Sequence, residues 1–558
     1  MVERKPTALQ KKLGEMRRKA EEREAERRAQ KAGIPYIDLR KIPANVEALK
    51  LIPEATAKEA QAAVVEMRKN EVAVATADPQ SAGFLKIIGQ LESQGYTPKT
   101  FIASKSGIQK FWDSYRFILE QAKEITGKVE LEPAHLEDLT KRLTSFQKVQ
   151  AEIQGLDFSQ ATTVTLLEIV LAGALATRAS DIHFEAQEEK ARIRFRLDGL
   201  LHDVFANLPP RNYEHLLSRI KLLSGLKLNV RDQAQDGRFT VGLIAKEIEI
   251  RVSILPSEFG EATVMRLLDP DAIKVTLSDL GLREDDLEVV KRQLSKPNGL
   301  LLNTGPTGSG KTTTLYAFLG QIADPEVKII TIEDPIEYKI PGIQQTQVDP
   351  KAGYTFASGL RSILRQDPDV VLVGEIRDRD TADIALQAAL TGHLVFSTLH
   401  TNDAVGAVPR LVNLGVQPAS IGPATNVVIA QRLVRKLCLT CRKKTEPPPE
   451  LKTRIKKFLE RLPAKVNRQP YEDPILYQTA GCDACNGFGY RGRIGIFEFF
   501  ETGPEFEQAI LKEASEVVLR KFVAEQGMVT MQQDGILKSL AGITSFEEVE
   551  KTTGTLVW

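Results

Sequence analysis

A glycine-rich loop between an apolar run and a helix-forming stretch constrains this 558-residue chain more than any other feature. Residues 305–312 read GPTGSGKT, which fits the pattern G-x-x-x-x-G-K-[ST]. Such a loop brings backbone N–H groups to phosphate oxygens at the positive end of the following helix. The predicted nucleotide site comprises Gly305, Pro306, Thr307, Gly308, Ser309, Gly310, Lys311, Thr312 and Thr313.

Two side chains of this loop have specific expected roles. Lys311 reaches the β- and γ-phosphates, and the Thr312 hydroxyl ligates magnesium. A chance glycine-rich turn is the alternative. The apolar "GLLLNT" before the loop and the helical "TTTLY" after it favour the nucleotide site.

Other apolar runs also end in polar side chains. "DVVLVGE" ends at Glu375, "VKIITIED" ends at Glu333 and Asp334, and "HLVFSTL" precedes His400. Strands that alternate with helical stretches indicate a parallel sheet with crossover helices, whose carboxyl ends share one edge. Hydrolysis needs a carboxylate that orients water, so we expect these residues beside the P-loop. A lone histidine is more often structural, but its place at a strand end favours a γ-phosphate contact for His400.

The distribution of charged and apolar residues along the chain predicts its division into segments. The amino-terminal residues are rich in Lys, Arg and Glu and lack aromatic side chains, which is typical of a solvated helical arm or tail. "IPYIDL" (34–39) and "VAVATADP" (72–79) read as strands, and "ARIRFRLDG" and "EIEIRVSIL" alternate as half-buried strands do. The expected segments are a charged helical arm (1–33), an α/β module (34–115), a helical connector (116–158), an arginine-rich α+β domain (159–275), a P-loop domain (276–435), a tetracysteine insert (436–500) and a helical carboxyl-terminal region (501–558).

Composition narrows the function classes. The chain has 75 basic and 74 acidic residues, and a net charge of +1 disfavours a globally basic nucleic-acid-binding protein. Four cysteines are too few for a disulfide scaffold, which favours a reducing compartment. No run of about 20 apolar residues is present, and the first residues lack an apolar signal core. We therefore expect a cytoplasmic location with no membrane span.

The cysteines form two C-x-x-C pairs, Cys438 with Cys441 and Cys482 with Cys485. Two such pairs can give zinc a closed four-thiolate shell, so the expected role is structural. The gap between the pairs is longer than in a simple zinc ribbon and would hold an excursion that includes "TEPPPE". A redox C-x-x-C is the alternative, but nothing thioredoxin-like surrounds either pair.

Four ordered segments, "GPTGSGKTTTLY", "TIEDPIEY", "LRSILRQDPDVVLVGEIRD" and "ALTGHLVFSTLHTNDA", resemble the Walker A, Asp, Walker B and His boxes of secretion ATPases. These are the traffic ATPases of type II secretion and type IV pilus assembly. Further back, "ASDIHFE", "RFRLDG" and "QDGRF" are similar to the second amino-terminal domain of that family. The resemblance implies a RecA-like α/β P-loop domain, preceded by a PAS-like α+β domain and an amino-terminal α/β module, with a zinc-binding insert and a helical carboxyl terminus.

The resemblance also assigns roles. Glu375 matches the Walker B glutamate that polarises water, Glu333 and Asp334 match the Asp-box acids, and His393 and His400 match the His box. In the family, arginines of the second domain reach a nucleotide held by a subunit. The candidates here are Arg238, Arg251 and Arg266, with Arg194 and Arg196. The sequence does not decide among these arginines.

The function that the resemblance implies is a Mg-dependent ATPase that assembles as a hexamer at an inner-membrane platform protein and drives pilin addition in type IV pilus biogenesis. A type II secretion ATPase that acts on pseudopilins is the alternative within the family. A nucleotide-gated scaffold without turnover and a DNA translocase are alternatives outside it. "KLGEMR" lacks the leading arginine and final leucine of the family's cyclic di-GMP motif, so we do not expect that ligand.

Overall fold

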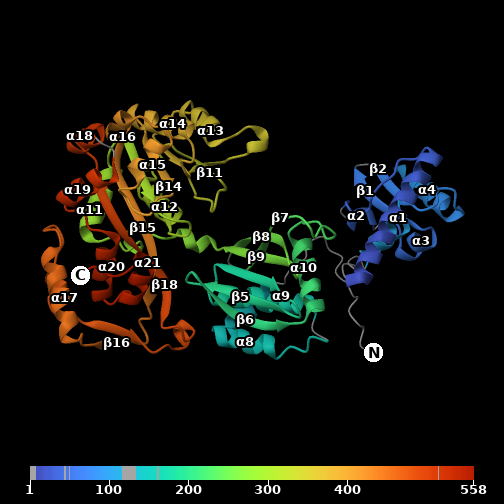
Figure 1. Cartoon of the computed structure of the whole chain (residues 1–558), viewed down its shortest axis with the longest axis horizontal. Coiled ribbons are helices and arrows are strands. Elements are labelled where there is room, and N and C mark those ends of the chain that lie inside the picture. Colours follow the sequence, from blue (N-terminus) through green and yellow to red (C-terminus); the bar gives the residue numbers. More distant parts are fainter. Residues whose placement is uncertain are drawn as a thin grey trace. The chain divides into compact units, whose positions relative to one another are not determined.

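The structure, a computed structural model, describes residues 8–42, 46–49, 51–68, 70–112, 114–115, 133–159, 162–244, 246–512 and 515–558. The chain divides into two compact units, Met1–Leu267 and Leu268–Trp558. Figure 1 shows their helices and strands.

The first unit begins with a small α/β module. Its sheet has the order β1-β2-β3 and consists of β1 (Ala62–Arg68), β2 (Glu71–Thr76) and β3 (Thr97–Ile102). The helices α2 (Val46–Leu49), α3 (Glu54–Glu59), α4 (Ala82–Ser93) and α5 (Lys105–Trp112) accompany it. The strand predicted at 72–79 is confirmed as β2. The prediction of a strand at 34–39 is wrong, because only an isolated bridge between Tyr36 and Ile102 forms there.

The charged amino-terminal stretch forms one long helix, α1 (Ala8–Ala32). Most residues of its second half are exposed, as expected, but one face is not solvated, because Ala25 and Ala29 are buried there. The Glu22 carboxylate accepts hydrogen bonds from the Tyr36 hydroxyl at 2.6 Å and the Ser104 hydroxyl at 2.7 Å. A buried acceptor with two donors fastens the helix to the module that follows.

A second part of the first unit holds a six-stranded sheet in the order β6-β5-β4-β9-β8-β7. The strands are β4 (Asp181–Ala186), β5 (Ala191–Leu197), β6 (Leu200–Leu208), β7 (Gln235–Gly242), β8 (Glu247–Ser257) and β9 (Gly260–Leu268). On β5, buried and half-buried residues alternate, as the sequence pattern predicts. The helices are α9 (Thr163–Ala176) and α10 (Pro210–Leu223).

The predicted helical connector ends in two helices that belong to this second part. They are α7 (Pro133–Arg142) and α8 (Phe146–Gln154), and both contact α9. Leu136, Val149 and Ile153 are fully buried, so the apolar side chains of this stretch cover α9 instead of facing solvent. Residues 116–132 of the predicted connector lie outside the described residues.

The second unit is built on a seven-stranded sheet in the order β12-β11-β13-β14-β10-β15-β18. Only β15 and β18 pair antiparallel among these described strands. The strands are β10 (Gly299–Thr304), β11 (Ile329–Glu333), β12 (Gln344–Gln347), β13 (Val370–Val373), β14 (Leu394–Leu399), β15 (Thr425–Leu437) and β18 (Tyr490–Glu501). The helices are α11 (Glu284–Leu294), α12 (Lys311–Ile322), α13 (Phe356–Leu364), α14 (Arg379–Leu390), α15 (Ala407–Asn413) and α16 (Pro418–Ala424).

Apolar cores cover both faces of this sheet. Along β10, Leu300 and Leu302 belong to one core and Leu301 to the other. Two-sided burial explains why the parallel strands read as continuous apolar runs in the sequence. The predicted α/β fold class with a largely parallel sheet is confirmed.

The tetracysteine segment leaves the sheet at the end of β15 and returns as β18. Between them lie β16 (Arg442–Thr445), α17 (Pro449–Arg461) and β17 (Leu476–Thr479). The predicted insert therefore extends too far, because residues 490–501 form a strand of the main sheet. Figure 1 places β16 and α17 at the end of this unit opposite α13 and α14. The carboxyl-terminal helices are α18 (Pro504–Lys512), α19 (Glu516–Glu525), α20 (Met531–Leu540) and α21 (Phe546–Thr553).

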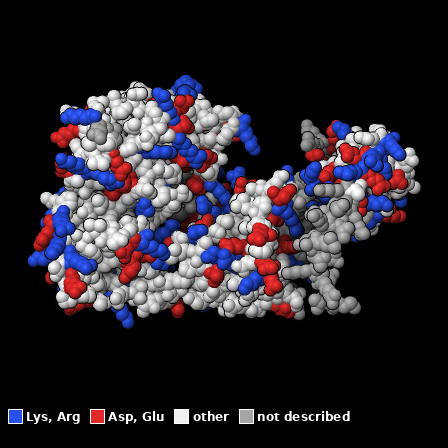
Figure 2. All heavy atoms as spheres, in the orientation of Figure 1, with Lys and Arg blue, Asp and Glu red and all other residues white. Residues whose placement is uncertain are grey.

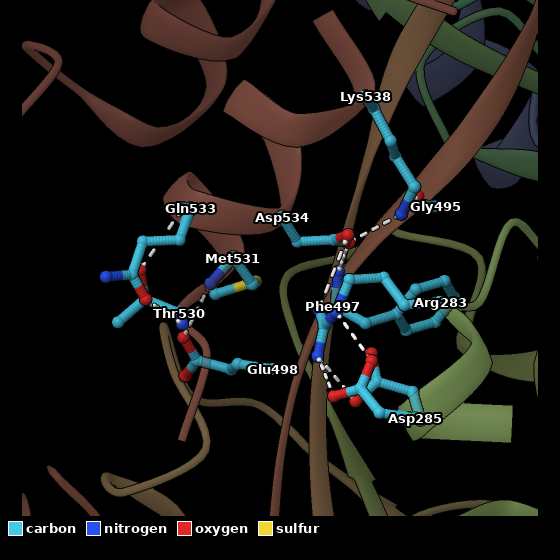
Figure 3. Close-up of polar contacts among 11 residues, drawn as sticks. Arg283, Asp285, Gly495, Phe497, Glu498, Thr530, Met531, Gln533, Asp534 and Lys538 are labelled. Carbon is cyan, nitrogen blue, oxygen red and sulfur yellow. Dashed lines mark hydrogen bonds and ion pairs between the residues drawn. The ribbon is translucent and has the colours of Figure 1, made fainter. Parts of the chain in front are cut away.

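A buried network of charges joins α20 to the main sheet (Figure 3). Asp534 accepts from the Phe497 backbone N–H at 2.8 Å and from the Lys538 ammonium at 2.5 Å. Lys538 also donates to the Gly495 carbonyl at 2.8 Å, and Arg283 lies 3.4 Å from Asp534. Asp534 is completely buried, so these charges depend on one another for solvation.

The surface carries both signs of charge. On the face in Figure 2, Lys and Arg side chains alternate with Asp and Glu side chains over both units. Among the described residues, no helix is long and apolar enough to cross a membrane.

Candidate functional site

The P-loop occupies the turn between β10 and α12. Gly305, Gly308 and Gly310 have φ values of +148°, +78° and +91°, which favour glycine. At Gly305 a Cβ would also lie 2.5 Å from the Gln431 carbonyl oxygen, so the loop has no room for a side chain there. Gly310 directly precedes the first turn of α12, where free N–H groups attract phosphate.

Lys311 opens α12 and folds back over the loop. Its ammonium donates to the carbonyl oxygens of Gly305 at 2.7 Å and Pro306 at 3.1 Å. Burial lowers the pKa of Lys311, and the negative charge of Glu375 opposes that effect. Thr312, the next residue, is exposed and can offer its hydroxyl to a bound cation.

Gln431 on β15 supports the loop from behind, a role that the sequence did not indicate. Its amide nitrogen donates to the Ser309 carbonyl at 2.7 Å, and its amide oxygen accepts from Asn303 at 2.7 Å. All three side chains are buried. This amide bridge ties the P-loop to two strands of the sheet.

The carboxyl ends of the parallel strands bring the predicted acids and histidine together. His400 follows β14, and its Nε2 lies 3.4 Å from a carboxylate oxygen of Glu375, which follows β13. Burial and the Lys311 charge lower the pKa of His400, with Glu375 opposing them. At neutral pH the imidazole is therefore largely uncharged.

Arg377 completes this group and was missed at the sequence level. Its guanidinium pairs with Glu375 and lies 3.5 Å from Asp334. It therefore bridges the Walker B acid and one Asp-box acid. The only sequence signal for Arg377 is its place two residues after Glu375 in "GEIRD".

The two Asp-box acids have different surroundings. The Asp334 side chain is 39% exposed, whereas Glu333 is buried at 4% exposure. The Glu333 carboxylate accepts from Thr331 at 2.6 Å, from Gln345 at 3.1 Å and from the Tyr316 hydroxyl. Asp334 is thus open to solvent, and Glu333 is held by neighbouring side chains.

His393 does not join this group. It precedes the amino end of β14, and its Nδ1 lies 3.1 Å from the Ala388 carbonyl. The edge that carries His400 is the other end of the same strand. The two histidines that match the His box therefore lie at different ends of β14.

The candidate arginines lie on the six-stranded sheet of the first unit. Arg238 on β7 faces Arg251 on β8 in the strand register. The Arg238 side chain is 76% exposed, and a carboxylate oxygen of Glu249 lies 3.9 Å from its guanidinium. Arg266 is also largely exposed, but its Nε donates to the buried Asp181 at 3.0 Å.

The other three candidate arginines of this sheet are less exposed than Arg238 and lie closer to carboxylates. Arg196 lies 3.3 Å from Asp181, and Arg194 lies 3.0 Å from Asp203. Arg251 lies 3.4 Å from Glu249. Arg238 therefore combines the greatest exposure with the loosest ion pair of the five candidates.

The four cysteines come together from both ends of the insert. Their sulfur atoms all lie within 4.8 Å of one another. Contacts of 3.7 Å join Cys438 to Cys482 and Cys482 to Cys485, and one of 3.9 Å joins Cys441 to Cys485. Tetrahedral zinc with Zn–S bonds of about 2.3 Å requires sulfur separations of about 3.8 Å.

Backbone groups also prepare these thiols for a cation. The N–H groups of Cys482 and Gly489 each point to the Cys485 sulfur at 3.2 Å. Burial raises the pKa of Cys438, but backbone N–H groups of Thr440 and Cys441 bring it down to about 7, whereas burial raises the pKa of Cys441 and of Cys482. The arrangement fits a four-thiolate metal site.

Comparison with known proteins gives consistent results. Residues 157–551 match the family described as Type II/IV secretion system protein, and residues 32–134 match the MshEN domain. The chain is 36% identical to the type IV pilus assembly ATPase PilB of Thermus thermophilus over 93% of its own length, and it spans 56% of that relative. It is 45% identical to type II secretion system protein E of Pseudomonas aeruginosa over 70% of this chain and 76% of that protein.

The fold has a solved counterpart. The X-ray structure of the ATPase DotB of Legionella pneumophila aligns with a TM-score of 0.51 at 22% identity. The alignment covers 71% of this chain and 97% of that one. This likeness supports the fold alone.

Proposed function

Because this chain belongs to the Type II/IV secretion system protein family, we propose that it is a Mg-dependent ATPase that drives pilin assembly in type IV pilus biogenesis. One observation carries the proposal: the P-loop lysine, Glu375 and His400 converge at the carboxyl edge of one parallel sheet. This arrangement can bind a triphosphate and place a carboxylate near its end.

Each group has a distinct task in that reaction. The Lys311 ammonium exchanges its carbonyl partners for the β- and γ-phosphates. Thr312 and Glu375 would hold magnesium, which would neutralise charge on the phosphates. Glu375 also orients the attacking water, and the uncharged His400 donates or accepts a hydrogen bond beside it.

We also propose a structural zinc ion at the four cysteines. Four thiolates leave no open coordination position, so zinc would join the two ends of the insert and take no part in hydrolysis. The redox alternative requires a C-x-x-C pair separated from other thiols, whereas here both pairs share one cluster.

The pilus pathway is favoured by how far the similarity extends. The similarity to the pilus assembly relative covers 93% of this chain and therefore includes amino-terminal residues. The similarity to the type II secretion relative covers 70% of it but is higher in identity. Type II secretion therefore remains the second candidate. Deletion of the gene, with pilus number and protein secretion both measured, separates the two.

The wider assembly follows from the same proposal. We expect a homo-hexamer at the cytoplasmic face of the inner membrane, bound to a platform protein and acting indirectly on pilins or pseudopilins. An arginine of the first unit, with Arg238 the leading candidate, would complete the nucleotide site of a neighbouring subunit. The amino-terminal α/β module carries none of the proposed ATP-binding groups, so we assign it to docking.

Phosphate release from the purified protein tests the ATPase. Wild type and Glu326→Gln, a change at an exposed turn, are expected to hydrolyse ATP at equal rates. Glu375→Gln should bind ATP but release little phosphate. Equal rates for wild type and Glu375→Gln would favour a scaffold without turnover. Salt-dependent stimulation by DNA would instead favour a translocase.

A further inference from the structure

Glu333 is the most tightly held acid of the nucleotide edge. It ends β11, and its side chain meets three donors on three separate segments: Thr331 on β11, Gln345 on β12 and Tyr316 on α12. Thr331 and Gln345 both bond Oε1, so the Tyr316 hydroxyl is the described donor to Oε2. A buried carboxylate with donors on both oxygens has one preferred orientation.

Tyr316 comes from the helix that holds the P-loop lysine. It lies on α12, which begins at Lys311, and it is 5% exposed. Burial and the adjacent Glu333 charge raise the pKa of Tyr316, so its hydroxyl keeps its proton and can only donate to the carboxylate. The Tyr316 hydroxyl therefore remains a donor across the physiological pH range.

Gln345 secures the other oxygen with the backbone around it. Its amide nitrogen also donates to the Tyr338 carbonyl at 3.0 Å, and its amide oxygen accepts from the Ile340 N–H at 2.8 Å. These bonds fix the segment that follows the Asp box. Movement of this segment would thus be transmitted to the Glu333 carboxylate.

The position of Glu333 affects the site through Asp334, the next residue in the chain. Asp334 follows Glu333 directly and reaches Arg377, which pairs with Glu375. A continuous set of contacts therefore links the P-loop helix to the Walker B acid. We propose that Tyr316 is a positioning residue for ATP turnover: its hydroxyl holds the Glu333 carboxylate at the nucleotide edge. This inference rests on the proposed ATPase function.

The test is Tyr316→Phe, which removes the hydroxyl and keeps the aromatic ring in the core. Loss of one hydrogen bond to a charged group predicts a kcat lower by about tenfold to hundredfold. The KM for ATP should stay within about twofold, because the described hydrogen bond of the Tyr316 hydroxyl goes to the Glu333 carboxylate and not to the phosphate loop. A purely structural role would lower the melting temperature and leave the kcat of the folded protein unchanged.

Tyr354→Phe is the matched control. The Tyr354 hydroxyl donates to Thr346 at 3.1 Å, on the same strand as Gln345, and Thr346 donates to the Thr331 backbone carbonyl at 2.8 Å and not to the Glu333 carboxylate. This variant should retain the wild-type kcat and KM. A reduced kcat in Tyr316→Phe and in Tyr354→Phe alike would overturn the inference, because a general effect on this side of the sheet would then explain both.

A double-mutant cycle tests whether the effect passes through Glu333. If Tyr316 acts only by holding that carboxylate, Tyr316→Phe combined with Glu333→Gln should be no slower than Glu333→Gln alone. Multiplying defects, or a wild-type kcat in Tyr316→Phe, would reject the assignment. Should Tyr316→Phe fail to fold, Thr331→Val removes another donor to Glu333, and a wild-type kcat in that variant would reject it instead.

Failure of the proposed function gives a different pattern. In that case wild type would release phosphate no faster than Glu375→Gln, and the inference would fail with it. An active wild type with an equally active Tyr316→Phe rejects the positioning role alone.

Discussion

At the scale of single residues, the four cysteines are the side chains that most require a bound ligand. Their sulfur atoms approach to 3.7–3.9 Å without a disulfide. Several thiolates at this distance repel one another, and a divalent cation removes that repulsion. At the residue scale, we therefore expect a bound cation to hold the two ends of the insert together, in addition to the apolar core that Ile455 and Phe458 of α17 form with α20.

We predict one zinc ion per chain, retained on mild purification and lost in Cys482→Ser. Structural zinc contributes roughly 10 kcal/mol or more in isolated fingers. Here the cluster joins β15 to β18 beside a large core, so local unfolding of the insert is expected instead of global loss. Native mass spectrometry measures the metal. Asp483→Asn, an exposed non-ligand in the same turn, should keep its zinc. Reduced, anaerobically purified wild type without stoichiometric metal would contradict the prediction.

The tertiary structure also separates residues that share a sequence box. Asp334 is open to solvent and Glu333 is buried, although they are adjacent. Alternating side-chain direction at the end of β11 sends them to different surroundings. The Glu333 carboxylate is therefore fixed by its neighbours, whereas Asp334 is free to contact Arg377.

At the element scale, two charged contacts attach the carboxyl-terminal helices to the main sheet. The first is the Asp534 network of α20 shown in Figure 3. The second joins α21 to β15, where the Arg435 guanidinium pairs with the Glu548 carboxylate. Both lie largely out of solvent.

Asp534→Asn should destabilise the protein by about 3–5 kcal/mol, because Lys538 and Arg283 would lose a buried counter-charge. Chemical denaturation monitored by circular dichroism measures the loss. Glu446→Gln breaks the exposed pair with Lys452 and should change stability by less than about 1 kcal/mol. Equal effects of the two substitutions would show that the α20 network does not hold the helix.

The α21 contact predicts a dependence on pH. Burial alone would raise the pKa of Glu548, but hydrogen bonds and charge from Arg435 lower it below its ordinary 4.5. The unfolded chain therefore binds this proton more readily than the folded chain. The stabilisation is complete above about pH 4.5 and is lost as the pH falls through the folded-state pKa.

Thermal melting of wild type and Glu548→Gln from pH 7 to pH 3 tests this contact. The variant should melt a few degrees lower at neutral pH, and the difference should shrink as the solution becomes acidic. Glu525→Gln removes an exposed carboxylate that lies 4.0 Å from Lys521 and should follow wild type throughout. A constant gap between wild type and Glu548→Gln at every pH would argue against the ion pair as its cause.

At the scale of the whole molecule, the question is how subunits cooperate. If Arg238 completes the site of a neighbouring subunit, Arg238→Ala and Glu375→Gln should each be nearly inactive. Such arginines are worth about 10³–10⁵ in rate. Mixed before assembly, the two variants should regain part of the activity, since some interfaces would pair an intact arginine with an intact glutamate.

Phosphate release across mixing ratios measures this recovery, with mixed assemblies verified by differently tagged subunits. Lys311→Ala mixed with Glu375→Gln is the control, because both defects fall within one chain's site and no interface can restore it. Flat activity at every ratio of Arg238→Ala to Glu375→Gln would reject the assignment across subunits. Arg251 and Arg266 would then be the next candidates.

Local sequence was sufficient for the phosphate loop, for the strands that are buried on both faces and for the cysteine pairs. A P-loop is a continuous segment whose glycines, lysine and hydroxyl act through nearby backbone, so residues 305–312 specify it directly. Strands buried on both faces need continuous apolar runs, and for that reason β10, β13 and β14 could be predicted from the sequence. Each C-x-x-C pair likewise brings two thiols together within one turn.

Contacts between distant segments were decided only by the tertiary structure. Tyr316 and Gln345 reach Glu333 because α12, β11 and β12 pack together, and no local pattern marks either residue as its partner. His393 and His400 belong to one sequence motif but lie at opposite ends of β14, so the motif alone does not show that only His400 is at the nucleotide site. Side-chain direction and the order of strands in a sheet arise from packing of the whole unit, and for that reason the sequence alone located the nucleotide edge but not the contacts that hold it in place.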